Sequence, residues 1–390
     1  MKHIISKSCA DAQAYIVPFR AGSHRGVSIA PEMDAAVDLA INGSFGGNLG
    51  ETYAMTLPVG NKLTSIILLG LGADKLSERD IHTKAAQAFK QAKQLGAKHV
   101  AIMLDQVSEL SESAELFGAL ARLPQLVGYT NSGLKSNPEN KNFEQITFVT
   151  AADTLDAALS EAVATARGTI IARRLCNLRS NEQTPQSLAA DAAALGKEYG
   201  FDVQLFDKAA IEELGMESFL SVARGAHNTP PVLIVMRYLN GDDSPRIGLV
   251  GKGIVYDSGG YSIKTTPGMK NMFDDMGGAA AVIGAMTAVA DQKLKANVIG
   301  VIAACENKVA ADAYVPGDII GSMSGKTIEV ISTDAEGRLT LADAVTYIQR
   351  KESCRFVADI ATLTGSAKTA VGKYSAAVLT NNEELYASAR

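Results

Sequence analysis

Apolar residues in this chain gather in short runs that alternate with longer helical patterns. In the N-terminal part, three strand-like runs surround a helical stretch at 79–95, and the runs lie at 65–73, 99–104 and 145–150. Further along, helical patterns at 277–291 and 339–350 separate strand-like runs at 231–237, 246–251, 297–304, 327–331 and 356–363. The first group predicts a βαβ unit. The whole pattern predicts an α/β fold with a mainly parallel central sheet and helices on both faces.

The same pattern divides the chain into three parts. A polar segment at 131–142 is typical of a loop, so we place a boundary near residue 150, after the next strand-like run. Residues 152–175 are rich in Ala, Leu and Ile at helical spacing, which predicts a linking helix. We therefore expect an N-terminal α/β domain at 1–150, a linking helix at 151–180 and a second domain at 181–390.

Local signals add detail to the second domain. Thr184 and Pro185 are a typical helix start, and that helix should end near Gly200. Asp207 can cap another short helix.

Composition and charge exclude several classes of protein. Of the 390 residues, 47% are hydrophobic and 20% are charged, which is typical of a globular protein. The formal net charge of −5 argues against nucleic acid as a main partner. The four cysteines form no C-x-x-C pair, and we find neither a signal-peptide core nor an apolar run of about 20 residues. We expect a soluble cytoplasmic protein with no membrane partner.

Chemistry-bearing residues are densest at 250–264. This segment holds Lys252, Asp257, Lys264 and four glycines, and it follows a predicted strand. Glycine lets the backbone approach a ligand closely, and open α/β sheets bind ligands at the carboxyl ends of their strands. A surface turn with both lysines in solvent explains the segment equally well.

Two further segments carry acids. Asp274 and Asp275 precede a helix of small residues, where an acid is commonly a helix cap. Asp334 and Glu336 follow the predicted strand at 327–331, but such a pair also occurs in plain surface turns, where Arg338 would simply pair with one of them.

Together, the segments place four carboxylates at predicted strand-to-helix junctions of one sheet, namely Asp257, Asp275, Asp334 and Glu336. Like charges gathered in this way repel unless cations neutralise them, so a divalent metal is the natural counter-charge. Four carboxylates suffice for two ions about 3.5–4 Å apart, as in two-metal hydrolases. The five histidines are isolated, which excludes a His-x-x-x-His zinc site. Cys305 fits a small buried hydrophobe better than a nucleophile.

These motifs resemble the signature segments of the leucyl aminopeptidase family, the dinuclear-metal cytosol aminopeptidases. The similar segments are 250–264, Asp-Met-Gly-Gly-Ala-Ala at 275–280 and Thr-Asp-Ala-Glu-Gly-Arg-Leu at 333–339. The likeness spans roughly residues 160 to 380. The N-terminal part resembles the family only in its general α/β pattern.

The resemblance implies a role for each matching residue. It places one metal ion on Lys252, Asp257, Asp275 and Glu336, and the other on Asp257, Asp334 and Glu336. The ions would be Mn or Zn, with Mg or Co as alternatives, and they activate the attacking water. Lys264 would stabilise the oxyanion, and Arg338 would hold a bicarbonate. The positions that match the family's substrate pocket are Thr362, Leu363 and Gly365, although these also fit ordinary sheet residues.

The implied activity is removal of N-terminal, leucine-like residues from peptides with a free N-terminus by a homo-oligomer, a hexamer in the family. Two alternatives stay open: a two-metal phosphoryl hydrolase, and a non-catalytic or DNA-binding family member. Two features depart from the family. Ser332 stands where asparagine is usual, and the chain ends at Arg390 whereas family members normally continue. All matching metal and catalytic positions are present, but in the family that tail contributes to the substrate pocket and the hexamer contacts, so residue preference and oligomeric state stay open.

Overall fold

A computed structural model describes residues 1–131, 136 and 142–389. Most of the loop predicted at 131–142 lies outside these described residues. The chain forms two compact units, and each is described by itself below. The first comprises Met1–Arg174 with Thr287–Lys293, and the second comprises Leu175–Met286 with Leu294–Arg390. Helix α6, Asp156–Asn177, occupies most of the predicted linking segment.

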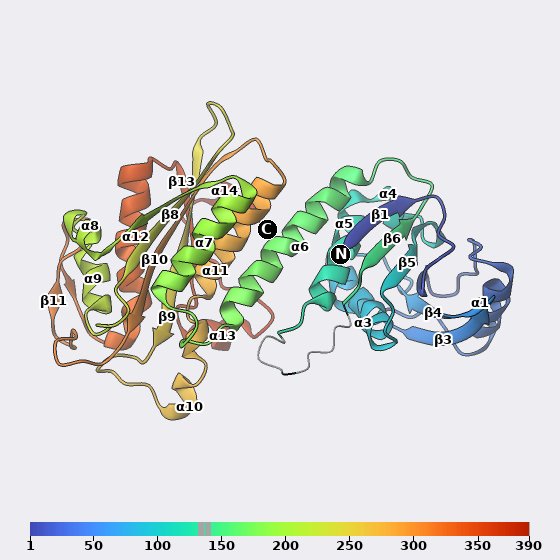
Figure 1. The fold of residues 1–390 in the computed structure, drawn as a ribbon, viewed down its shortest axis with the longest axis horizontal. Helices are drawn as coiled ribbons and strands as arrows, with labels where there is room; N and C mark the ends of the chain where they lie inside the picture. The colour runs from blue at the N-terminus through green and yellow to red at the C-terminus, as the bar shows by residue number, and fades with distance from the viewer. Residues whose placement is uncertain (132–135, 137–141, 390) are drawn as a thin grey trace. The chain divides into compact units, whose positions relative to one another are not determined.

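The first unit is built on a six-stranded sheet in the order β1-β6-β5-β2-β4-β3 (Figure 1). All pairings are parallel except that of β3 with β4. The predicted βαβ unit is confirmed, because β4 and β5 both pair in parallel with β2 between them. The strands are β1 Lys2–Ser6, β2 Ala14–Phe19, β3 Thr52–Val59, β4 Lys62–Gly70, β5 His99–Met103 and β6 Gln145–Val149.

Helices cover both faces of this sheet because its inner strands are apolar on both sides. Helix α1, Pro31–Gly43, packs Met33 and Val37 against one face. On the other face, α3, Ala86–Gln94, and α5, Ala114–Gly128, bury Phe89 and Phe117. The helix predicted at 79–95 is real but irregular, since a π-helical turn, η1, at Ile81–Ala85 separates α2, Glu78–Asp80, from α3. Short helices η2, Leu104–Gln106, and α4, Glu109–Glu112, follow β5.

The second unit is built on a five-stranded sheet in the order β13-β9-β10-β8-β7. Strands β13, β9 and β10 pair in parallel, whereas β8 and β7 add to the sheet antiparallel. The sequence pattern did not predict β7, because that strand is mostly solvent-exposed and has no apolar run. The strands are β7 Asp202–Phe206, β8 Val232–Leu239, β9 Arg246–Asp257, β10 Asn297–Asn307 and β13 Phe356–Ile360.

Helices also cover both faces of the second sheet, and Figure 1 shows α7 and α11 on one side and α9 and α12 on the other. The bounds are α7 Pro185–Tyr199, α8 Lys208–Glu213, α9 Glu217–Ala223, α11 Gly277–Asp291 and α12 Glu336–Glu352. The predicted caps are confirmed. Thr184 caps α7, which ends at Gly200 in the left-handed conformation (φ 89°), and Asp207 caps α8.

Small residues let α11 lie directly on the sheet. A Cβ atom on Gly278 would lie only 2.0 Å from the carbonyl oxygen of Ile360 in β13. Similarly, a Cβ atom on Gly251 of β9 would lie 2.7 Å from the Cα atom of Ala279. The glycine- and alanine-rich start of α11 therefore brings the preceding acids close to the end of the sheet.

Two predictions about the central sheet are wrong. The strand predicted at 327–331 is the two-residue β12, Ile328–Glu329, and it pairs with β11, Ile319–Ile320, in a separate sheet. Asp334 and Glu336 therefore do not follow a central strand, because the short run before them buries too little apolar surface to join the core. In addition, β9 continues through Asp257, so Lys252 lies within a strand rather than after it.

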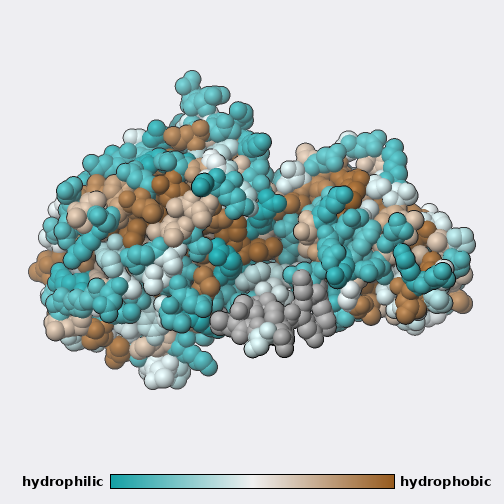
Figure 2. All heavy atoms as spheres, in the orientation of Figure 1, coloured by the Kyte–Doolittle hydropathy of each residue, from teal (hydrophilic) through white to brown (hydrophobic). Residues whose placement is uncertain are grey.

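The remaining described elements are short. They are α10 Thr266–Met269, η3 Met272–Asp274, η4 Thr333–Ala335, α13 Gly365–Val371 and α14 Glu383–Ala389. No helix among the described residues is long and apolar enough to cross a membrane. Figure 2 shows hydrophilic residues over much of the visible face of each unit, with apolar patches between them.

Candidate active site

Asp257 is the last residue of β9, and its side chain is almost fully buried, with 1% of its surface exposed. Its Oδ1 atom accepts hydrogen bonds from the Gly259 backbone N–H (2.8 Å) and from Nδ2 of Asn307 (2.7 Å). Because two donors hold this oxygen, the carboxylate has one orientation, with Oδ2 facing Lys264.

A tight turn of two glycines follows Asp257. Gly259 and Gly260 have φ angles of +86° and +61°, which side chains rarely adopt. A Cβ atom on Gly259 would lie 2.5 Å from the Ser262 carbonyl oxygen and 2.9 Å from Oδ1 of Asp334. The turn therefore needs glycine both for its conformation and to let Asp334 approach. The turn leads to Lys264, whose backbone N–H donates to the Ser258 carbonyl oxygen (3.0 Å).

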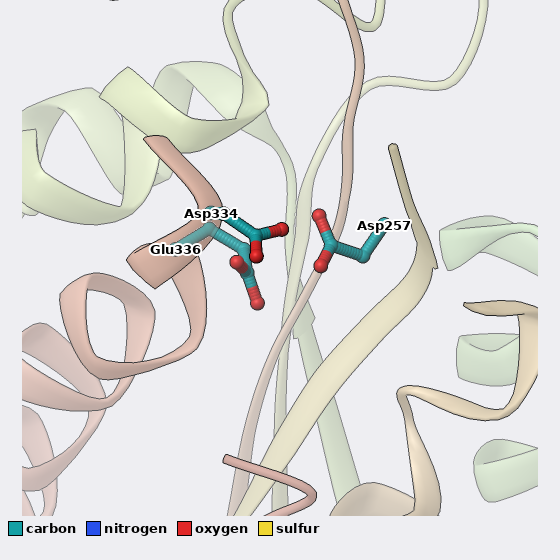
Figure 3. Close-up of side chains that lie close together, drawn as sticks. All are labelled: Asp257, Asp334 and Glu336. Carbon is teal, nitrogen blue, oxygen red and sulfur yellow. The ribbon is translucent and has the colours of Figure 1, made fainter. Parts of the chain in front are cut away.

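Asp334 and Glu336 come from the segment that opens α12. Asp334 lies in η4, and Glu336 is the first residue of α12, with 1% of its surface exposed. Ser332 caps η4 by accepting from the Asp334 N–H, so the serine that departs from the family's asparagine still supplies a side-chain acceptor. Figure 3 shows the carboxylates of both residues directed toward Asp257. The three residues each place a carboxylate oxygen within 4.8 Å of the other two.

Two lysines bridge the carboxylates. Lys264 Nζ lies 2.8 Å from Oδ2 of Asp257 and 2.5 Å from Oδ1 of Asp334. Lys252 Nζ lies 2.8 Å from Oδ2 of Asp275 and 2.8 Å from Oε1 of Glu336. Two ammonium groups thus face four carboxylates, which leaves two negative charges in excess when all are ionised.

Burial changes the proton affinity of these groups. It raises the pKa of Glu336 to about 7 and that of Asp275 to about 6, although the positive charge of Lys252 opposes both shifts. Burial disfavours the charge of Lys252, yet Glu336 and Asp275 outweigh it and raise the lysine pKa. In the same way, hydrogen bonds to Asp257 and Asp334 raise the pKa of Lys264. Both lysines are therefore cationic beside these carboxylates.

The cluster fits divalent metal ions. Oε2 of Glu336 is buried and has no hydrogen-bond partner among the described residues, so it is a free ligand atom. The other acceptors are carboxylate oxygens, which suit Mg, Mn or Zn. The excess negative charge supplies the electrostatic reason for a cation.

Gly337 makes room for Lys252. A Cβ atom on Gly337 would lie 2.6 Å from Cε and 2.7 Å from Nζ of the lysine. Because the lysine side chain is buried and held by two carboxylates, it cannot move aside cheaply. The Glu-Gly pair that opens α12 thus supplies both a carboxylate and the space for the lysine that contacts it.

Asp275 lies between η3 and α11 and is tied to the segment after β13. The Thr362 hydroxyl donates to Oδ1 of Asp275 (2.7 Å), and Lys252 Nζ donates to the Thr362 carbonyl (3.0 Å). Thr362 therefore joins the cluster. In contrast, Leu363 and Gly365 are solvent-exposed and make no hydrogen bond to the cluster among the described residues.

Arg338 lies in the first turn of α12 and is exposed to solvent. Within the described part of the chain it makes no ion pair, so the simple alternative of a pair with Asp334 or Glu336 is wrong. Cys305 is fully buried in the core, and burial raises the pKa of its thiol well above the usual value, as expected of a hydrophobe rather than a nucleophile.

The structure adds residues that the sequence pattern did not single out. Asn307 contacts Asp257, and the Tyr314 hydroxyl donates to the Thr333 carbonyl (2.9 Å). The sequence held one signal that could have pointed to Asn307. The polar pair Glu306-Asn307 ends a strand that is apolar along most of its length.

Comparison with known families decides the assignment. The sequence model of the cytosol aminopeptidase family's catalytic domain matches residues 170–390, which is more than half of the chain, and that of its N-terminal domain matches residues 34–138. The chain belongs to the cytosol aminopeptidase family. The first domain, which resembled the family only in general pattern, is therefore a family domain as well.

Curated relatives agree. The chain is 43% identical over 361 residues to a probable cytosol aminopeptidase of Clostridium perfringens, covering 89% of this chain and 72% of the relative. It is 42% identical over 342 residues to one of Fusobacterium nucleatum, covering 87% and 69%. Among solved structures, the bottromycin maturation enzyme BotP in complex with Mn superposes with a TM-score of 0.78 at 27% identity, covering 93% of this chain and 75% of that one.

Membership of the cytosol aminopeptidase family makes this chain a peptidase, and thus a hydrolase whose substrates are peptides. It is a metal-dependent aminopeptidase with a divalent metal cofactor. This assignment argues against the alternative of a phosphoryl hydrolase.

Proposed function

We propose that this cytosol aminopeptidase removes leucine-like residues from the free N-terminus of peptides with two divalent ions at the Asp257–Glu336 cluster. The observation that carries the proposal is the convergence of Asp257, Asp334 and Glu336. The orphaned, buried Oε2 atom of Glu336 supports it.

One ion would be held by Lys252, Asp257, Asp275 and Glu336, and the other by Asp257, Asp334 and Glu336. Asp257 and Glu336 would be shared. When bound, two such ions polarise the scissile carbonyl and activate a water molecule. Manganese or zinc is the metal we propose, and the similarity to a solved enzyme in complex with Mn supports manganese.

Lys252 must change its protonation state to act as a ligand. Its ammonium contacts Asp275 and Glu336, and both carboxylates raise its pKa. An amine binds a metal only through its free lone pair, so the proton on Nζ has to leave as the metal enters. Nearby divalent charge favours that loss, because like charges disfavour the ammonium.

Lys264 and Arg338 supply the remaining positive charge. Lys264 keeps its proton and is less buried than Lys252, so we assign Nζ as the donor to the oxyanion that develops on the scissile carbonyl. Arg338 offers a guanidinium with no protein partner among the described residues, which suits a bicarbonate as a proton carrier.

The substrate and the assembly complete the proposal. We assign Thr362, Leu363 and Gly365 to the substrate pocket, where the exposed Leu363 offers apolar surface to a leucine-like side chain. A free α-amine near the carboxylate cluster would explain the preference for N-termini. We also propose that the protein is a cytoplasmic homo-oligomer. Only the resemblance to the family, whose members form hexamers, supports this part of the proposal.

Turnover of leucine p-nitroanilide by the purified chain tests this function. We expect hydrolysis that needs added Mn²⁺ or Zn²⁺ and stops with EDTA, and we expect no cleavage of the N-acetylated substrate because its α-amine is blocked. Folded, metal-loaded protein that cleaves neither leucine nor other N-terminal residues would contradict the proposal and favour a non-catalytic family member.

The stabilisation by Mn²⁺ should depend on pH. Since burial raises the folded-state pKa of Asp275 to about 6 and of Glu336 to about 7, their contribution to metal-free stability is present below pH 4 and is lost as pH rises through 6 and 7. Mn²⁺ binding needs these groups deprotonated. We therefore expect the increase in Tm with saturating Mn²⁺ to grow from pH 5 to pH 7.5, and to go on growing above pH 7.5 because Lys252 also has to lose a proton. Calorimetry with and without Mn²⁺ measures it, and an increment independent of pH would contradict the proposed ligand set.

A further inference from the structure

Asn307 lies directly behind the carboxylate cluster and joins two of its segments. It is the last residue of β10 and is completely buried. Its Nδ2 atom donates to Oδ1 of Asp257 (2.7 Å) and to the carbonyl oxygen of Thr333 (2.9 Å), the residue before Asp334. One amide group thus connects the end of β9 with the segment that opens α12.

The orientation of this amide follows from its partners. Both atoms near Nδ2 are acceptors, a carboxylate oxygen and a carbonyl oxygen. The amide oxygen in their place would face two acceptors, so the nitrogen must point to them. Both amide protons are used, whereas Oδ1 of Asn307 is buried and has no hydrogen-bond partner within the described part of the chain. A buried oxygen without a hydrogen bond destabilises the fold, which indicates that the two hydrogen bonds donated by Nδ2 offset this loss.

An irregularity in β10 aims the side chain. The register between β10 and β9 shifts between Cys305 and Glu306, and after the shift Asn307 stands opposite Asp257. Such bulges redirect side chains and are frequent next to active sites. The Asn307 carbonyl is also fixed, because it accepts from the Ser258 N–H (3.0 Å) and the Ser258 hydroxyl (2.7 Å).

The Thr333 peptide is held from several sides. Its carbonyl also accepts from the Tyr314 hydroxyl (2.9 Å), and its own hydroxyl donates to the Gly259 carbonyl (2.7 Å). Asp257 depends more directly on Asn307, which supplies one of only two hydrogen bonds that its Oδ1 accepts among the described residues. The amide therefore acts on a carboxylate that both proposed ions would share.

We propose that Asn307 is a positioning residue, which orients Asp257 and sets its spacing from Asp334 for divalent metal binding. This inference rests on the proposed function. Hydrogen bonds to ligating carboxylates are part of what fixes metal affinity, and their loss typically costs 10–100-fold.

The chain offers a matched control at the other end of the same strand. Asn297 is also buried, its Nδ2 donates to the carbonyls of Asp242 (3.2 Å) and Ser244 (2.8 Å), and its Oδ1 accepts from Gly241 (3.0 Å). The two asparagines are about 33 Å apart along β10 at 3.3 Å per residue. Asn297 is thus a structural asparagine remote from the cluster.

The experiment compares Asn307→Leu with Asn297→Leu in the 390-residue chain. Leucine has a similar shape and donates no hydrogen bond. Mn²⁺ affinity is measured by competition with a fluorescent chelator, and folding stability is measured by urea unfolding in EDTA. We expect both variants to lose stability, but only Asn307→Leu to bind Mn²⁺ about 10–100-fold more weakly. The Mn²⁺ concentration for half-maximal turnover should rise by the same factor.

Each outcome is decisive. Wild-type Mn²⁺ affinity in Asn307→Leu, with stability lost as in Asn297→Leu, would overturn the positioning role and leave the proposed function intact. A wild-type chain that binds no Mn²⁺ would instead overturn the proposed metal centre, and the role of Asn307 with it. If Asn307→Leu does not fold, Asn307→Ser provides the measurement. A single hydroxyl proton can serve only one of the two acceptors, so affinity should still fall.

Discussion

Lys264→Met is expected to lower kcat for leucine p-nitroanilide by about 10²–10³-fold, the usual cost of removing one oxyanion donor. Methionine keeps the length of the side chain but has no charge and no proton to donate. Lys264 Nζ contacts Asp257 and Asp334, so its removal takes away a cation that competes for the same oxygens. Mn²⁺ affinity should therefore not weaken, and steady-state kinetics at saturating Mn²⁺ will separate the two effects.

Lys270→Met is the matched control for this experiment. Lys270 is an exposed lysine six residues further along, and it makes no ion pair within the described chain. Its replacement should leave kcat unchanged. A kcat for Lys264→Met within threefold of the wild type would contradict the assigned role of Lys264. If Mn²⁺ binding is lost together with kcat, the lysine acts mainly by holding the carboxylates in place.

Glu336→Gln should have a still larger effect, because it removes a carboxylate that both proposed ions would share. Glutamine preserves the size of the side chain, but it removes the negative charge and turns one ligand oxygen into an amide nitrogen. A bound ion supplies several kcal/mol of transition-state stabilisation, and about 1.4 kcal/mol is tenfold in rate. We expect turnover to fall by about 10³-fold or more.

Metal stoichiometry checks the cause of that loss. We expect two Mn²⁺ per wild-type chain and fewer than two in Glu336→Gln, by elemental analysis after equilibrium dialysis. Glu329→Gln serves as the control, since Glu329 is an exposed glutamate in β12 of the same unit. Full Mn²⁺ occupancy in Glu336→Gln would contradict the shared-ligand assignment even if activity were lost.

Part of the local structure of this protein could be read from its sequence. Thr184-Pro185 and Gly200 bound α7 as expected, because caps and left-handed glycines act within a few residues. The strands β4, β5, β8 and β10 were visible as apolar runs because they are buried on both faces. By contrast, β7 was missed because its residues are mostly exposed at the sheet edge, and β1, β2 and β3 were not predicted either, although β2 is buried along its whole length.

The candidate ligands were also evident from the sequence, through residue types and their resemblance to a known family. The sequence did not show how Asp334 and Glu336 reach Asp257. They come from the start of α12 after a separate β-hairpin, and not from a strand of the central sheet. That placement depends on long-range packing, notably the Thr333 hydroxyl on the Gly259 carbonyl, and no local pattern encodes such a contact.

The sequence by itself determined the α/β class, the limits of α7 and the set of ionisable groups, since these follow from hydrophobic periodicity, capping and side-chain chemistry. Only the tertiary structure decided which charges meet. It placed Lys252 between Asp275 and Glu336, left Oε2 of Glu336 without a hydrogen-bond partner among the residues that the structure describes, and set Asn307 behind Asp257. The physical reason is that electrostatic and hydrogen-bond energies depend on distances of a few ångströms between residues remote in sequence, and only the packed fold sets those distances.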